Sequence, residues 1–131
     1  MDIVGLGIDA TDIPRVAALV ERYGDRFLRR VFTDGEIAYC NLRRNAVPHL
    51  AARFAAKEAA MKALGTGQTR DVLWKDIEVV REDGPPQLRF HGGAADRAAR
   101  MQVVKSLLTI THSDALAIAQ VVLLAREGTS G

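Results

Sequence analysis

Residues 50–64 form the stretch LAARFAAKEAAMKAL, and the sequence GTG follows directly at residues 65–67. Alanine, leucine, lysine, glutamate and methionine are strong helix formers, and a glycine after such a run commonly ends a helix. The stretch therefore predicts a helix over residues 50–64. On its helical wheel, Glu58 falls beside the stripe of large apolar side chains, close to the predicted buried face.

The first residues of the chain have the pattern of a strand. In residues 3–9 (IVGLGID) apolar and small residues alternate, so that Val4, Leu6 and Ile8 share one face while glycines and Asp9 share the other. This pattern predicts an opening strand with a carboxylate at its exit.

The other segments predict helices and strands in alternation. Apolar residues at three- and four-residue spacing predict an amphipathic helix over residues 14–31, and Thr33 with Glu36 has the form of a capping box. Further predicted elements are strands over 74–80 and 87–90, a helix over 92–104, and a hairpin of strands 107–111 and 115–124 joined by His112, Ser113 and Asp114.

Length and composition bound the class of protein. The chain has 131 residues, of which 48% are hydrophobic and 26% charged, and its formal net charge is +2. This length suits one compact domain, so we expect a single domain over residues 1–131. A lone Cys40 cannot form an internal disulfide, and no apolar run approaches the roughly 18 residues of a membrane span. We therefore expect a cytoplasmic protein that has no membrane partner.

Asp9 and Glu58 are the candidate metal ligands. An ionised carboxylate near a buried face is costly unless it is paired or bound to a metal. Lys62 follows Glu58 by four residues on the same side of the helix, so an ordinary helix ion pair is one interpretation. A magnesium site is the other, because Mg²⁺ takes one or two carboxylates and completes its shell with water and substrate phosphate.

Two further features have a structural explanation beside a functional one. Gly65 and Gly67 allow a ligand to approach the backbone closely, but a glycine after a helix is also an ordinary C-cap. His112 stands at the predicted hairpin turn, where a histidine is more often only solvated. His49 and His91 have no acidic or cysteine partners at ligand spacing, so the sequence predicts no zinc site.

Five arginines lie on one side of the predicted helix over residues 14–31. At about 100° per residue they fall inside an arc of roughly 100° beside the apolar face. Such a stripe favours an acidic partner through electrostatic steering. Nucleic acid is a less favoured partner, because aromatic residues for base stacking are few and no nucleic-acid-binding motif is present. The stripe consists of Arg15, Arg22, Arg26, Arg29 and Arg30.

Three segments occur in a specific order: GIDATDIPR at residues 7–15, RFAAKEAAMKALGTG at 53–67 and LLTITHS at 107–113. Together they resemble the holo-acyl-carrier-protein synthases, the small type of 4′-phosphopantetheinyl transferase. Intervening pieces are also similar, namely FTDGEIAYC at 32–40, WKDIEV at 74–79 and GPPQL at 84–88. The resemblance therefore covers nearly the whole chain, and its middle segment is the most specific.

This resemblance implies a fold, an assembly and an activity. The implied fold is α+β, a twisted antiparallel sheet packed against helices, in a homotrimer with active sites between subunits. The implied activity is transfer of the 4′-phosphopantetheine arm of coenzyme A to a serine of apo acyl carrier protein, with release of adenosine 3′,5′-bisphosphate. Carrier proteins are acidic, so the carrier would dock on the arginine stripe, in particular on Arg15, Arg22, Arg26 and Arg29.

The resemblance also implies roles for individual residues. Asp9 and Glu58 would bind Mg²⁺, while Lys62 and His112 would contact phosphates of coenzyme A, because a breaking pyrophosphate needs its growing charge offset by metal and cations. Glu58, Lys62 and His112 are thus the catalytic candidates, and either Glu58 or a metal-bound water would take the proton of the serine hydroxyl. The nucleotide end would be bound by Arg53, Gly65, Thr66, Gly67, Lys62 and His112.

Two alternatives stay open at the level of sequence. The first is a non-enzymatic module whose basic helix binds an acidic protein or RNA, and such a module would need neither coenzyme A nor Glu58. The second is the same transferase acting on the carrier of a polyketide or peptide synthase instead of the fatty-acid carrier.

Overall fold

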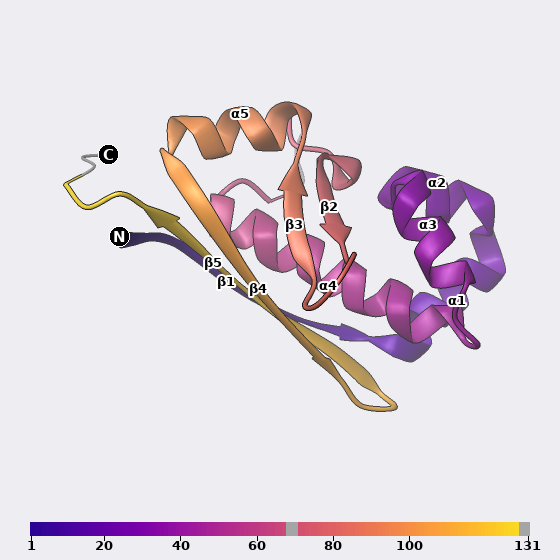
Figure 1. The fold of residues 1–131 in the computed structure, drawn as a ribbon. Coiled ribbons are helices and arrows are strands. Elements are labelled where there is room, and N and C mark those ends of the chain that lie inside the picture. Colours follow the sequence, from indigo (N-terminus) through magenta and orange to yellow (C-terminus); the bar gives the residue numbers. More distant parts are fainter. Residues whose placement is uncertain (68–70, 129–131) are drawn as a thin grey trace.

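The computed structural model describes residues 1–67 and 71–128. Within these residues, strands and helices follow one another in the order shown in Figure 1. The elements are β1 (Asp2–Asp12), α1 (Ile13–Tyr23), α2 (Asp25–Val31), α3 (Asp34–Asn41), α4 (Ala46–Leu64), the 3-10 helix η1 (Trp74–Asp76), β2 (Ile77–Val80), β3 (Gln87–Phe90), α5 (Gly92–Arg100), β4 (Val103–His112) and β5 (Leu116–Ala125).

The three long strands form one antiparallel sheet in the order β1–β5–β4, and β2 pairs with β3 in a separate antiparallel hairpin. Alanines of α4 pack in one buried cluster with Val121 and Leu123 of β5 and with Ile77 and Val79 of β2, so α4 is the central element of the core. In Figure 1, α1, α2 and α3 gather at one end of α4 and α5 lies near the other. The predicted α+β fold, a twisted antiparallel sheet packed against helices, is confirmed.

The glycine face of β1 is the face that meets α4. A Cβ atom at Gly7 would lie 1.8 Å from the carbonyl oxygen of Ala59, so only glycine lets strand and helix approach this closely. Leu6 and Ile8 point the other way and are each 60% exposed. Val4, which the alternation places with them, instead packs against the core, because the pairing with β5 shifts register between Ile3 and Gly5.

Several predicted boundaries are wrong. The helix predicted over residues 50–64 begins earlier, at Ala46, and the strand predicted over 107–111 begins at Val103, while three other segments differ in kind. The helix over residues 14–31 is divided into α1 and α2 at Gly24, which adopts a positive φ of 53°. The helix over 92–104 ends at Arg100, because Gln102 adopts a φ of 62° and β4 already begins at Val103. The strand over 74–80 begins with the turn η1, so that only residues 77–80 are extended.

Two local predictions are confirmed. Thr33 and Glu36 form a reciprocal capping box at the start of α3. Strands β4 and β5 form a hairpin, and the Ser113 hydroxyl accepts hydrogen bonds from the backbone of Ala115 and Leu116 in its turn. The sequence therefore encoded its local turns and caps more reliably than the ends of its helices.

A buried ion pair fixes α4 against the smaller hairpin. Lys57 and Glu36 are both fully buried, and the Lys57 Nζ lies 2.7 Å from the Glu36 carboxylate. Lys57 also donates hydrogen bonds to the carbonyl oxygens of Trp74 and Ile77, and Glu36 accepts one from the Val79 amide at 3.0 Å. Both charges are fully partnered, so this pair sets the position of α4 and has no free capacity for a ligand.

No helix in the described part of the chain is long and apolar enough to cross a membrane.

Candidate active site on two sides of helix α4

Two pockets flank α4, and each contains part of the predicted site. The carboxylate pocket, of about 130 Å³, lies beside β1 and is lined by Asp9 and Glu58 among others. The cation pocket, of about 520 Å³, lies beside β4 and is lined by Arg53, His49 and His112 among others. Strands β1 and β4 are separated by β5, so the two pockets lie toward opposite edges of the sheet.

In the carboxylate pocket, β1 presents Asp9 on the same face as its glycines, toward α4. The Asp9 carboxylate accepts hydrogen bonds from Lys62 Nζ at 3.0 Å and from the Thr11 hydroxyl at 3.1 Å. Asp9 is only 11% exposed, whereas Lys62 is 56% exposed and also donates to the carbonyl oxygen of Ile8. The ion pair between Lys62 and Asp9 thus joins α4 to β1 instead of linking two turns of α4.

Glu58 completes this pocket from α4. Burial and the neighbouring Asp9 carboxylate raise the pKa of Glu58, against the opposing effect of Lys62 and Arg15. Two carboxylates held together at a half-buried position repel each other, and a divalent cation between them would relieve that repulsion.

This donor set fits magnesium better than a metal with an all-protein shell. The described residues contain no group of three or more histidine, cysteine, aspartate or glutamate side chains that could hold a metal ion. A site with two carboxylates leaves coordination positions for water and phosphate, which is the arrangement that Mg²⁺ prefers.

The cation pocket has the opposite charge. Its lining includes Arg53, Arg81, His49 and His112, and none of the lining residues that the structure describes is an aspartate or glutamate. The other described lining residues are Tyr39, Ala52, Pro85, Pro86, Leu108, Thr109, Ile110 and Thr111. A pocket with this composition favours an anionic ligand.

Arg53 is the least satisfied group in the cation pocket. It is 5% exposed, its Nη1 donates only to the His49 carbonyl oxygen at 3.4 Å, and its Nε is buried without a hydrogen-bond partner in the described structure. The guanidinium groups of Arg53 and Arg43 each lie 4.2 Å from the centroid of the Tyr39 ring. A buried guanidinium without an anion is costly, so an anionic ligand would complete its contacts.

The two histidines of the pocket lie close together. The ring centroids of His49 and His112 are 6.3 Å apart, and His49 also meets the edge of the Tyr39 ring at 6.4 Å. Burial, together with the nearby charges of Arg53 and Arg43, lowers the pKa of His49. The imidazoles therefore belong to the same cationic surroundings as Arg53.

Sequence reasoning did not select His49, Tyr39, Arg43 or Arg81. One signal was available for His49, which precedes Arg53 by four residues and so lies on the same side of α4. Arg81 and Tyr39 come from the β2–β3 turn and from α3, and no spacing in the sequence links these segments to α4.

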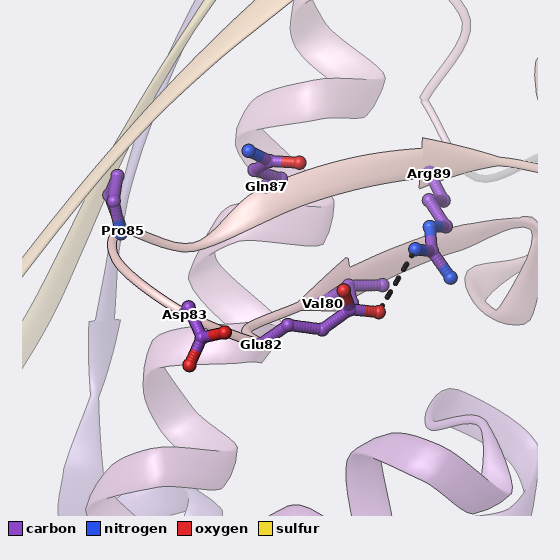
Figure 2. Close-up of a pocket in the computed structure, with 6 residues that line it drawn as sticks. All are labelled: Val80, Glu82, Asp83, Pro85, Gln87 and Arg89. Atoms are coloured by element: carbon purple, nitrogen blue, oxygen red, sulfur yellow. Dashed lines mark hydrogen bonds and ion pairs between the residues drawn. The ribbon is translucent and has the colours of Figure 1, made fainter.

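A further hollow, of about 140 Å³, lies under the β2–β3 turn (Figure 2). Its arginine, Arg89, already pairs with Glu82 at 3.2 Å, and Asp83 adds a second carboxylate to the lining. Pro85 lines both this hollow and the cation pocket. Because one arginine faces two carboxylates in the hollow, it has none of the excess positive charge that distinguishes the cation pocket.

The GTG segment after α4 acts as a helix cap. Gly65 has a φ of 74°, and its amide donates to the carbonyl oxygen of Lys62, as in an ordinary left-handed C-cap. Arg97 of α5 donates to the Leu64 carbonyl oxygen at 2.9 Å, which satisfies another free group of this terminus. Thr66 has a buried hydroxyl without a hydrogen-bond partner in the described structure, and residues 65–67 are absent from the described lining of both pockets.

The predicted arginine stripe is divided by Gly24. Arg15 lies on α1 and lines the carboxylate pocket, whereas Arg26 and Arg30 lie on α2. These two arginines border an open groove of about 440 Å³, which we call the arginine groove. It is lined by Leu19, Tyr23, Arg26, Phe27 and Arg30. All five arginines of the stripe are exposed.

Comparisons with known proteins agree with this architecture. The model of the 4′-phosphopantetheinyl transferase superfamily matches residues 5–121. The chain belongs to this family. A holo-[acyl-carrier-protein] synthase of Koribacter versatilis (strain Ellin345) is 49% identical over 122 residues, which cover 92% of this chain and 98% of that protein.

Two solved structures of the same family are similar over nearly the whole chain. The holo-[acyl-carrier-protein] synthase of Neisseria meningitidis superposes with a TM-score of 0.86 at 27% identity, covering 94% of this chain and 99% of that one. The Bacillus anthracis str. Ames synthase, solved in complex with CoA (3′,5′-ADP), gives a TM-score of 0.78 at 35% identity and covers 95% of this chain and 98% of that one.

Proposed function

We propose that this protein transfers the 4′-phosphopantetheine arm of coenzyme A to a serine of apo acyl carrier protein and releases adenosine 3′,5′-bisphosphate. The observation that carries the proposal is the pair of pockets of opposite charge beside α4, in a chain that belongs to the 4′-phosphopantetheinyl transferase superfamily. Coenzyme A brings both a diphosphate, which binds Mg²⁺ well, and a separate 3′-phosphate. A non-enzymatic basic module would require neither pocket.

The carboxylate pocket is the proposed reaction centre. Asp9 and Glu58 would hold Mg²⁺, which when bound offsets the charge that develops on the diphosphate as it is cleaved. Lys62, already hydrogen-bonded to Asp9, lies where it would add a second positive charge to the same oxygens. Either Glu58 or a water molecule bound to the metal would accept the proton of the serine hydroxyl.

The cation pocket is the proposed site of the nucleotide end. Arg53 and His112 would contact the 3′-phosphate, because the diphosphate must lie at the metal where the bond is broken. Pro86 supplies apolar surface beside these cations, against which a purine ring would pack. We retain Gly65, Thr66 and Gly67 only as candidates for contact with the ligand.

One chain cannot complete this site if a single coenzyme A is to use both pockets, because α4 itself lies between them. We therefore propose that the active site combines the carboxylate pocket of one subunit with the cation pocket of another, in a homotrimer. The open face of the long sheet supports assembly, since it exposes large apolar side chains that a second copy would cover. These side chains include Ile3, Leu6, Ile8, Leu107 and Leu116.

The arginine groove is the proposed docking surface for the carrier. Tyr23 and Phe27 offer apolar contact, and the exposed Arg26 and Arg30 would pair with acidic side chains of the carrier. Arg22 and Arg29 extend the positive charge along the same two helices, while Arg15 lies closer to the reaction centre.

The decisive experiment is incubation of the protein with coenzyme A, Mg²⁺ and an apo carrier protein, followed by mass spectrometry of the carrier. We expect the carrier to gain the mass of the arm only when Mg²⁺ is present. Carriers of fatty-acid, polyketide and peptide synthases tested side by side would identify the preferred substrate. No modification of any carrier would refute the transferase and favour the binding module.

Assembly is tested separately by sedimentation. We expect the chain to sediment at three times its own mass, and Ile8→Lys on the open sheet face to dissociate it. A monomeric wild-type protein with full activity would rule out the composite site.

A further inference from the structure

We propose that His49 is a proton-coupled contact for the 3′-phosphate of coenzyme A: its imidazole takes up a proton when the phosphate binds and releases it when the phosphate leaves. This inference rests on the proposed function of the cation pocket and adds to it a specificity-determining residue. Selection of coenzyme A over dephospho-coenzyme A would then depend on pH.

The position of His49 favours a contact with the ligand over a purely structural role. Its ring lies in the lining of the cation pocket, between Tyr39 and the second imidazole, His112. Its backbone carbonyl oxygen accepts the single recorded hydrogen bond of Arg53, so the two side chains belong to the same turn of α4 and serve the same volume. An anion that reaches the Arg53 guanidinium, whose Nε has no hydrogen-bond partner in the described structure, therefore also comes near the His49 ring.

The charged and titratable groups that face His49 are three arginines and a second imidazole, and no carboxylate is among them. Arg53 belongs to α4, Arg43 lies in the segment after α3, His112 ends β4 and Arg81 precedes the β2–β3 turn. Burial and these four groups lower the pKa of His49 below the ordinary value of 6.5. Without an anion nearby, these surroundings therefore disfavour the protonated form of His49.

A bound phosphate dianion reverses this balance. An opposite charge within hydrogen-bonding distance stabilises the protonated imidazole and raises its pKa, so the imidazole gains a proton on binding. The sign follows directly. The affinity for coenzyme A that His49 contributes is fully present below the pKa of His49 in the free protein. It is lost as pH rises through the higher pKa that His49 has in the complex. Dephospho-coenzyme A lacks the dianion and should not produce this effect.

The test is titration calorimetry of the full-length protein with coenzyme A and with dephospho-coenzyme A, in buffers of different ionisation enthalpy. The dependence of the measured heat on the buffer gives the number of protons taken up per ligand. The variants are His49→Phe, which keeps an aromatic ring against Tyr39 without a titratable group, and His112→Gln, which removes the neighbouring imidazole. Changes in the ionisation of the phosphate itself occur in all variants and cancel in the comparison.

We expect the proton uptake with coenzyme A, measured relative to that with dephospho-coenzyme A, to be larger in the wild type than in His49→Phe. His112→Gln should give the same relative uptake as the wild type. The preference for coenzyme A should also fall roughly three- to tenfold in His49→Phe at about pH 6.5, the effect of losing one hydrogen bond to a phosphate, and change little at about pH 8.

Arg53→Ala separates this inference from the function on which it rests. If Arg53→Ala weakens coenzyme A binding but His49→Phe takes up as many protons as the wild type, His49 is not the proton-coupled group and the inference fails while the pocket stands. If only His112→Gln reduces the proton uptake with coenzyme A, His112 is the group that takes up the proton, and the inference about His49 is equally wrong. If Arg53→Ala leaves coenzyme A binding unchanged, the cation pocket is not the nucleotide site and the proposed function itself must be revised.

Discussion

On the β1 side of α4 the structure holds two carboxylates together, and on the β4 side of the same helix it gathers arginines and histidines around a pocket without a described acid. A third arrangement lies between them in sequence, where Lys57 meets Glu36 as a fully buried and fully partnered pair. The charges of the buried pair compensate each other and all their hydrogen bonds are made within the protein, so the pair is structural. The two pockets are each incomplete, and a charge imbalance kept at a half-buried position indicates a missing ligand.

The two pockets also show how one helix can contribute side chains to two sites of opposite charge. Successive residues of a helix point about 100° apart, so Arg53 and Glu58, which are five positions apart, leave α4 in directions that differ by about 140°. The proposed composite site between subunits follows from this separation, because α4 lies between the two pockets of one chain. The opposite charges on the two sides of α4 are therefore the basis for the proposed assembly of subunits.

The largest expected effect comes from removing one carboxylate of the reaction centre. Glu58→Gln keeps the volume of the side chain but loses the charge that would hold Mg²⁺, so the transfer rate should fall on the order of 100-fold or more. Asp9→Asn should act in the same way. The measurement is transfer rate against Mg²⁺ concentration, with thermal unfolding as the control for folding. Near-normal activity with the usual metal dependence would remove both residues from the metal site.

A mixing experiment tests whether the two pockets act across a subunit boundary. Glu58→Gln damages only the carboxylate pocket and Arg53→Ala only the cation pocket, so co-expression of the two variants should restore intact composite sites. With equal amounts, half of each pocket type is intact, and roughly a quarter of the sites should be active. The assay uses a coenzyme A concentration at which Arg53→Ala alone is nearly inactive. Activity no greater than the average of the separate variants would place both pockets in one chain's site.

Much of the fold was accessible from local sequence, because its signals are local. Strong helix formers from Leu50 to Leu64, the capping box at Thr33 and the hairpin turn at Ser113 each act within a few residues. The break at Gly24 was missed for a related reason: the apolar period continues through the glycine from α1 to α2, so the pattern alone does not reveal the change of direction. The end of α5 was missed because Gln102, not a glycine, adopts the positive φ.

The candidate site was accessible only in part. The helical wheel placed Glu58 and Lys62 on one side of the helix, and the strand pattern placed Asp9 on the glycine face, but only the close packing of β1 on α4 brings Lys62 to Asp9. Arg53 and His112 were expected to act on the same substrate as Glu58. Nothing in the sequence indicates that α4 separates them, because that separation depends on the order β1–β5–β4 of the sheet.

Loss of Lys62 should have an intermediate effect. Lys62→Ala removes a partner of both Asp9 and the proposed phosphates, and since Lys62 is 56% exposed we expect kcat/KM for coenzyme A to fall about tenfold, less than for Glu58→Gln. Lys62→Arg, which keeps the charge, is the matched control and should retain most activity. If Lys62→Ala leaves both coenzyme A affinity and turnover unchanged, its pair with Asp9 is an ordinary surface ion pair.

The smallest expected effect concerns the arginine groove, which lies outside both pockets. Arg26→Glu combined with Arg30→Glu should raise KM for the carrier about tenfold and leave KM for coenzyme A nearly unchanged. Exposed charge pairs contribute about 0.2–1 kcal/mol each, so two reversals are combined to make the change measurable. Arg15 is left untouched because it lines the carboxylate pocket, and its reversal would alter the reaction centre as well.

Salt provides an independent measurement of the same contact. Wild-type activity at low carrier concentration should fall as ionic strength rises above about 0.15 M, where the screening length drops below about 8 Å, and the double variant should be less sensitive because its attraction is already lost.

Arg100→Glu with Arg126→Glu is the matched control: it changes the net charge equally, at exposed arginines outside the groove, and should leave KM for the carrier close to that of the wild type. If the control raises KM as much as the groove variant, only the overall charge attracts the carrier. A joint rise of KM for both substrates in the groove variant would instead indicate that Arg26 and Arg30 support the fold or the assembly, and the groove would no longer be the docking surface.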